Sequence, residues 1–247
     1  MDKQVSIQEE KISLTPEERG DILAYFRRVK TVVDNMVPDS GSRIASFLNS
    51  DLMLNKLRGK FSPVPVSFYF DVKDQRKGLY ENPPNQKIWL NIAAFSAREF
   101  DQSKGIFLPV RERVLKLNYS KMVAVFAHEW VHYKQETMKR NATFTKRVKS
   151  DKLGTKDNYK GLVSKKSYML QPFEQQAWAV EYLELLKQNL PTLKPMDILV
   201  RLKRLGVVDH EDLKDLKKTD YKAWKAIMKN IIVTALQDLK QQEPKKL

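Results

Sequence analysis

The sequence predicts an α+β fold, in which a small mixed sheet is flanked by helices on its N-terminal and C-terminal sides. Residues 64–70 alternate apolar with polar side chains, which is typical of a strand with one buried face, and residues 87–92 also have the composition of a strand. The segment at 120–139 instead repeats its apolar residues with a helical period and carries the motif His-Glu-x-x-His. Further helical segments at both ends complete the predicted architecture.

The first helix has a clear start signal after a polar segment, 1–14, that we expect to be a mobile tail. Thr15 is a suitable N-cap, Pro16 suits the first helical position, and Glu18 stands where a capping box requires an acidic residue. We expect this helix to continue to about residue 36. A second helix, at about 44–57, should precede the first strand.

The middle of the chain is expected to contain turns, a short helix, a short strand and a long helix. Residues 71–86 contain Gly78, Pro83 and Pro84 and are expected to form turns between the two strands. A short helical stretch at 93–100 and a short strand at 106–110 should follow. The helix at 120–139 then places its apolar residues on one side.

The C-terminal part is predicted to be helical after a basic connection at 140–166. Pro172 should open a helix that continues to about residue 189. The remaining predicted helices are at about 196–205, 210–217 and 221–241. The predicted domain organisation is a tail (1–14), a main domain (15–193) and a C-terminal helical subdomain (194–247).

The composition excludes several kinds of protein. The chain has no cysteine, which excludes a disulfide framework, a thiol nucleophile and a cysteine-based metal site. Any metal must therefore be held by histidine and carboxylate. No run of about 18 apolar residues is present, so we expect no membrane partner, and the polar N-terminus is unlike a secretory signal. We therefore expect a cytoplasmic protein.

The motif His128-Glu129-x-x-His132 is the strongest chemical signal in the chain. On a helix, residues four apart lie about 40° apart around the axis and about 6 Å apart along it, so both imidazoles can bind one metal ion. Glu129 is turned about 100° from His128 and is placed to take a proton from a metal-bound water. The alternative is a pair of solvated histidines beside a surface carboxylate.

A catalytic zinc site needs a third protein ligand, and Glu174 is the best candidate. It lies 42 residues after His132, in the first turn of the helix opened by Pro172. Glu181, two turns later, is a weaker candidate; it could instead orient a ligand histidine or lie on the surface. Glu136 is too close to His132 in sequence. The alternative role for Glu174 is a first-turn carboxylate that interacts with the helix dipole.

His128–His132 followed by Tyr168-x-x-x-Pro172-x-Glu174-x-x-Ala177 resembles the zincin metallopeptidases of the gluzincin type, and most of all the small zincin-like proteins of phages and bacteria. The resemblance covers roughly residues 64–190. It implies a zincin-like fold, a Zn²⁺ ion on His128, His132 and Glu174, and Glu129 as the general base. It also implies that the strand at 88–91 is an edge strand that pairs with an extended substrate. The basic connection departs from the most compact members of the family.

Two tyrosines are further candidates for the site, whereas the remaining histidine is not. Tyr168 precedes the predicted third-ligand helix, and its phenol could donate a hydrogen bond to the oxyanion formed during acyl transfer. The alternative for Tyr168 is a buried aromatic residue. Tyr133 has a weaker claim of the same kind. His210 is expected on the surface of a helix.

The predicted function is that of a zinc-dependent peptidase acting on a protein or peptide substrate. The alternative is a zincin-fold binding or structural protein, with a structural or vestigial metal site and with nucleic acid or a phage virion as its partner. The formal net charge of +15 attracts acidic partners, and residues 133–167 contain eleven Lys/Arg against three Asp/Glu. This segment is a candidate nucleic-acid contact or a solvated loop.

Overall fold

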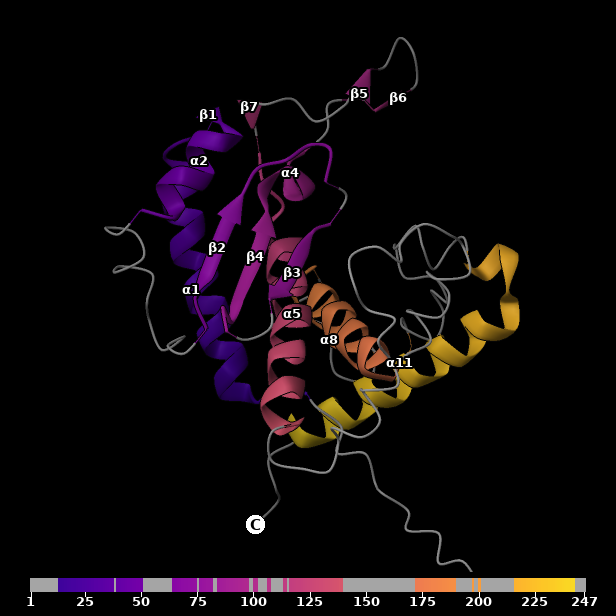
Figure 1. The fold of residues 1–247 in the computed structure, drawn as a ribbon. Coiled ribbons are helices and arrows are strands. Elements are labelled where there is room, and N and C mark those ends of the chain that lie inside the picture. The colour runs from indigo at the N-terminus through magenta and orange to yellow at the C-terminus, as the bar shows by residue number, and fades with distance from the viewer. Residues whose placement is uncertain are drawn as a thin grey trace, which may run out of the picture.

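The computed structural model confirms the α+β class: it combines a small mixed sheet with a larger share of helices (Figure 1). The description that follows covers residues 13–37, 39–50, 64–74, 76–81, 84–97, 100–101, 106–107, 113–114, 116–139, 172–189, 197, 200 and 216–242. Several predicted segments lie wholly or mostly outside these residues: the end of the second helix after residue 50, the basic connection at 140–166, and the helices at 196–205 and 210–217. In the described part, no helix is long and apolar enough to cross a membrane.

Helix α1 (Pro16–Asp34) begins as predicted, with a complete capping box. The Thr15 hydroxyl oxygen accepts from the Glu18 amide at 3.1 Å, and the Glu18 carboxylate accepts from the Thr15 amide at 2.8 Å. The helix buries one apolar stripe: Ile22, Tyr25, Phe26, Val29 and Val33. Leu14 is also buried, so the end of the segment expected to be a mobile tail is part of the packed core.

The main sheet has the strand order β2-β4-β3, with β2 (Val66–Tyr69) parallel to β4 (Lys87–Asn91) and β3 (Gly78–Glu81) antiparallel to it. The prediction of an edge strand at 88–91 is therefore wrong, because β4 is central and is paired on both sides. The segment expected to contain only turns supplies β3, which is the edge on one side. On the other side, the Asn49 side chain exchanges two hydrogen bonds with the backbone of Phe68 and occupies the edge of β2.

Short elements connect these strands to the helices. Helix α2 (Gly41–Leu48) follows strand β1 (Asp39–Ser40), which pairs with β7 (Arg113–Val114). Strands β5 (Phe100–Asp101) and β6 (Ile106–Phe107) form a second short antiparallel pair.

Asn91 connects the end of β4 to helix α4 (Ile92–Phe95) and to the loop after β2. Its side chain is fully buried; Oδ1 accepts from the amides of Asp71 and Ala93, and Nδ2 donates to the carbonyls of Asp71 and Asp74. We expect Asn91→Ala to lower the free energy of unfolding by about 2–4 kcal/mol, because it leaves buried backbone groups without partners. Urea denaturation checks this, and Asn85→Ala, at an exposed position, should change stability by less than about 0.5 kcal/mol.

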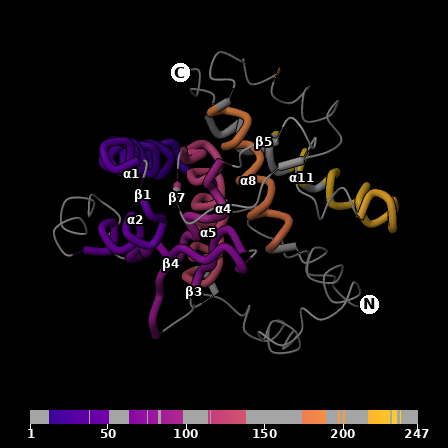
Figure 2. The backbone as a smooth tube through the Cα atoms, turned by 90° about the horizontal axis from the view of Figure 1, so that it is seen from above, coloured from indigo at the N-terminus to yellow at the C-terminus, as the bar shows by residue number. Residues whose placement is uncertain are grey.

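Three long helices complete the arrangement: α5 (Tyr119–Lys139), α8 (Pro172–Asn189) and α11 (Tyr221–Gln242). Viewed from above, α1, α5, α8 and α11 follow one another across the molecule (Figure 2). One apolar cluster joins α1, the sheet and α5. A second cluster joins α8 to the C-terminal helix through residues that include Trp178, Tyr182, Trp224 and Ile227. Helix α8 therefore has α5 on one side and α11 on the other.

Candidate metal centre

Helix α5 carries the His-Glu-x-x-His motif through the centre of the molecule. The carboxamide of Asn118 caps its start by accepting from the Lys121 amide at 3.0 Å. Residues 122–131 are buried without interruption, because the sheet, α1 and α8 all pack against this helix. His128 is only 7% exposed and Glu129 8%. The alternative of a solvated histidine pair with a surface carboxylate does not fit this burial.

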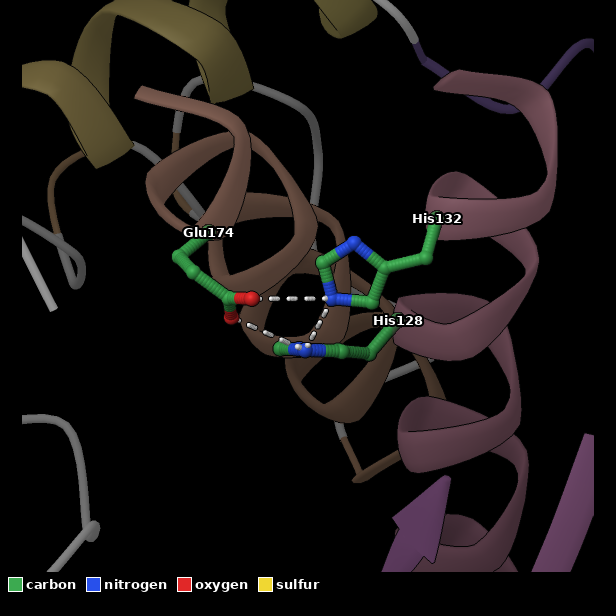
Figure 3. Close-up of side chains that lie close together, drawn as sticks. All are labelled: His128, His132 and Glu174. Carbon is green, nitrogen blue, oxygen red and sulfur yellow. Dashed lines mark hydrogen bonds and ion pairs between the residues drawn. The ribbon is translucent and has the colours of Figure 1, made fainter. Parts of the chain in front are cut away.

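Helix α8 brings Glu174 to the two histidines, although they are 42 residues apart in sequence. The Nε2 atoms of His128 and His132 lie 3.1 Å apart (Figure 3). Oε1 of Glu174 lies 3.4 Å from Nε2 of His132, and Oε2 lies 3.7 Å from Nε2 of His128. The predicted third ligand is thus placed beside the two predicted histidine ligands, and it is 2% exposed.

The outward-facing nitrogens of both imidazoles have oxygen atoms as neighbours. Nδ1 of His128 lies 3.0 Å from Oε2 of Glu181, and Nδ1 of His132 lies 2.9 Å from Oε1 of Gln135. Gln135 donates its own amide hydrogen to Oε1 of Gln176, which keeps the Gln135 carbonyl turned toward His132. Oxygen acceptors favour a proton on each Nδ1, so that the two Nε2 atoms present lone pairs.

These lone pairs make the group fit a metal ion. Two unprotonated nitrogens and a carboxylate oxygen, converging within 4.8 Å, repel one another unless a cation lies between them. Oε2 of Glu174 is buried and accepts no hydrogen bond from any residue that the structure describes. Tetrahedral zinc with bonds of about 2.0–2.1 Å would hold its ligand atoms about 3.3–3.4 Å apart. The two Nε2 atoms, 3.1 Å apart, are close to that spacing, and each has one of the two Glu174 oxygens at 3.4 or 3.7 Å.

The charges around the imidazoles support the same conclusion. Burial alone would lower the pKa of His128, but the carboxylates of Glu174, Glu181 and Glu129 outweigh burial and raise this pKa to about 10. Burial alone would raise the pKa of Glu174, but His132 and His128 outweigh it and hold this pKa well below its usual range. The carboxylates therefore require a cation among them, either a proton on His128 or a metal ion.

Glu129 lies beside this group but takes no part in it. Its Oε2 accepts from the backbone amide of Tyr80 in β3 at 2.8 Å. Burial raises the pKa of Glu129, although the positive charge of protonated His128 and His132 would act in the opposite direction. A buried carboxylate with a raised pKa, next to a metal site and outside its ligand set, is suited to general-base chemistry.

The structure gives less information on the other predicted site residues and on the basic segment. Tyr168 and His210 lie outside the described residues, so their predicted roles stay predictions. The Tyr133 ring is half-buried, with its centroid 5.0 Å from that of Trp130 and 6.2 Å from that of Tyr80. Glu136 is partly exposed and does not belong to the metal-binding group. Most of the basic segment 133–167 is outside the described part of the chain.

Sequence reasoning missed Gln135 and left open the role of Glu181. A usable signal existed for Gln135, because a residue three positions after His132 lies on the same face of the helix, one turn later. Glu181 is two turns beyond Glu174, and the structure places it at His128 rather than in the ligand group.

We expect Glu181→Leu to weaken zinc binding about 10–100-fold, because Nδ1 of His128 would lose the carboxylate that lies 3.0 Å away and favours a proton on this nitrogen. Competition with a chromophoric chelator measures this change. Glu181→Gln offers a carbonyl oxygen at the same position and should recover most of the loss. Equal zinc affinities in the wild-type chain, Glu181→Leu and Glu181→Gln would contradict the positioning role of Glu181.

No protein-family model, curated protein or solved structure was found to match this chain. Its function is therefore inferred from the arrangement of its own side chains.

Proposed function

We propose that this chain is a zinc-dependent peptidase of the zincin type, with Zn²⁺ held by His128, His132 and Glu174 and with Glu129 as the general base. The observation that supports this proposal most strongly is the convergence of three ligand residues from α5 and α8, of which His128 and Glu174 are buried and His132 is partly buried, beside the separate carboxylate of Glu129. Two imidazoles and one carboxylate suit zinc, and three protein ligands are typical of a catalytic rather than a structural zinc site.

When bound, zinc would polarise the carbonyl of the scissile bond and lower the pKa of a water molecule. Glu129 accepts the proton of that water and later donates it to the leaving amine. The pKa of Glu129 is raised by burial, which brings its two protonation states closer in free energy and suits both transfers. Glu181 and Gln135 place oxygen atoms beside the Nδ1 atoms of the two histidines, which favours protons there and would leave both Nε2 atoms to hold the ion.

The proposed substrate is a protein or peptide. Addition of a substrate strand to residues 88–91 is not part of the proposal, because β4 already pairs with β2 and β3. The strand nearest to Glu129 is β3, whose Tyr80 amide contacts the Glu129 carboxylate.

The test combines metal analysis with a cleavage assay on the purified 247-residue chain. We expect about one zinc ion per chain by mass spectrometry, and cleavage of unfolded casein that stops with a chelator and returns on adding zinc. A chain that takes up no zinc would overturn the proposal. Zinc at full occupancy without cleavage of casein or of a mixed peptide library would also overturn it, and would favour the binding or structural alternative.

A further inference from the structure

The backbone of β3 lies unusually close to α5 at Glu129. A Cβ atom added at Gly78 would stand 2.8 Å from Cγ1 of Val125 and 3.1 Å from both Cγ and Oε1 of Glu129. The first distance is shorter than packed carbon atoms allow, so a side chain at this position would push the strand and the helix apart. Glycine therefore permits the close approach of β3 to the Glu129 side chain.

The amide of Tyr80 is the group that this approach brings to Glu129. Tyr80 is paired with Ile88 of β4, but the Ile88 amide donates to the carbonyl of Pro65 on the opposite side of β4, at 3.0 Å. Tyr80 and Ile88 are thus a non-hydrogen-bonded pair of the antiparallel ladder, and the Tyr80 amide points outward from the sheet. It donates to Oε2 of Glu129 at 2.8 Å, in a buried setting.

We propose that β3 positions the carboxylate of Glu129 for catalysis, with the Tyr80 amide holding Oε2 and Gly78 leaving room for the carboxylate. This inference rests on the proposed peptidase function. A charge-assisted bond to a backbone amide restricts rotation of the carboxylate, so that Oε1 remains the oxygen free to exchange a proton. Gly78 and Tyr80 are positioning residues; neither belongs to the metal-binding group.

The Tyr80 amide can be removed without breaking the sheet. Tyr80→Pro deletes an outward-pointing N–H, which edge strands tolerate because no ladder bond is lost. Tyr80→Leu is the matched control, because it loses the same ring but keeps the N–H. We expect kcat of Tyr80→Pro to be about 10–100-fold below that of Tyr80→Leu, with equal KM and equal zinc content in the two variants.

A second variant tests the close approach of β3 to Glu129 rather than the Tyr80 amide. Gly78→Ala should lower kcat about 10–100-fold without loss of zinc, because it displaces Glu129 while the ligands on α5 and α8 keep their partners. The positioning role is wrong if folded Tyr80→Pro keeps the kcat of Tyr80→Leu, or if folded Gly78→Ala keeps the kcat of the wild-type chain. A fall in zinc content that parallels the fall in kcat would also overturn it, since the effect would then be structural.

Hydrogen exchange tests the contact without any activity. In protein labelled with ¹⁵N-tyrosine and ¹⁵N-leucine, Glu129→Ala should accelerate exchange of the Tyr80 amide at least about tenfold and leave Leu79 unchanged, since Leu79 is paired within the ladder. Unchanged exchange at Tyr80 overturns the inference. This measurement distinguishes the positioning role of β3 from the proposed peptidase function. Its result does not depend on whether the wild-type chain cleaves peptides.

Discussion

Glu129→Gln is expected to lower kcat for peptide cleavage about 10²–10⁴-fold while the chain keeps its zinc. Glutamine has the same shape as glutamate, and its carbonyl oxygen can still accept the hydrogen bond from the Tyr80 amide. It cannot take up a proton from water. Because Glu129 is not part of the group of His128, His132 and Glu174, the ion should remain bound. Steady-state kinetics and metal analysis on the same sample measure both quantities.

Glu136→Gln is the matched control for this variant. Glu136 is on the same helix, one turn beyond His132, and lies outside the metal-binding group. Its replacement should change kcat less than about twofold. Full activity in Glu129→Gln would show that another group acts as the base, and zinc loss in Glu129→Gln would place Glu129 among the residues that stabilise the ion.

The sequence predicted those parts of the fold that depend on local signals. The start of α1 follows from Thr15 and Glu18, each of which accepts a hydrogen bond from the backbone amide of the other, and the structure has this capping box. Helix α8 begins at Pro172 and ends at Asn189 as expected, because proline at the first helical position is a strong local signal. The long helical period of α5 was equally clear.

The order of the strands could not be predicted, because pairing is decided between distant segments. β3 contains only Gly78, Leu79, Tyr80 and Glu81, and of these only Tyr80 is buried, so the segment has no strong alternation. It becomes a strand because it pairs with β4 and packs against α5. The edge position expected for the strand at 88–91 followed from the family resemblance alone, and in the structure β3 occupies that edge instead.

The spacing between α5 and α8 depends on contacts that no motif describes. Glu18, in the first turn of α1, accepts from Lys134 and Trp130 of α5 at 3.0 and 3.3 Å. The next residue, Arg19, donates to both oxygens of buried Glu184 in α8, at 2.8 and 2.9 Å. One turn of α1 thus connects the two helices that carry the ligand group. Glu174 could be named from the sequence as a candidate, but these contacts, which place its helix beside α5, could not.

Glu174→Ala is expected to weaken zinc binding more than about 100-fold, a larger loss than for residues that only orient a ligand. The variant removes one of the three converging ligand atoms and a carboxylate whose charge favours a cation at the two imidazoles. Glu184→Gln is the matched control, because Glu184 is equally buried on the same helix but is paired with Arg19. It should lose stability yet bind zinc within about threefold of wild type. Competitive titration with a chromophoric chelator measures both affinities. If Glu174→Ala binds zinc as tightly as Glu184→Gln, the third ligand lies elsewhere, and the convergence of Glu174 on the histidines serves only the packing of α8 against α5.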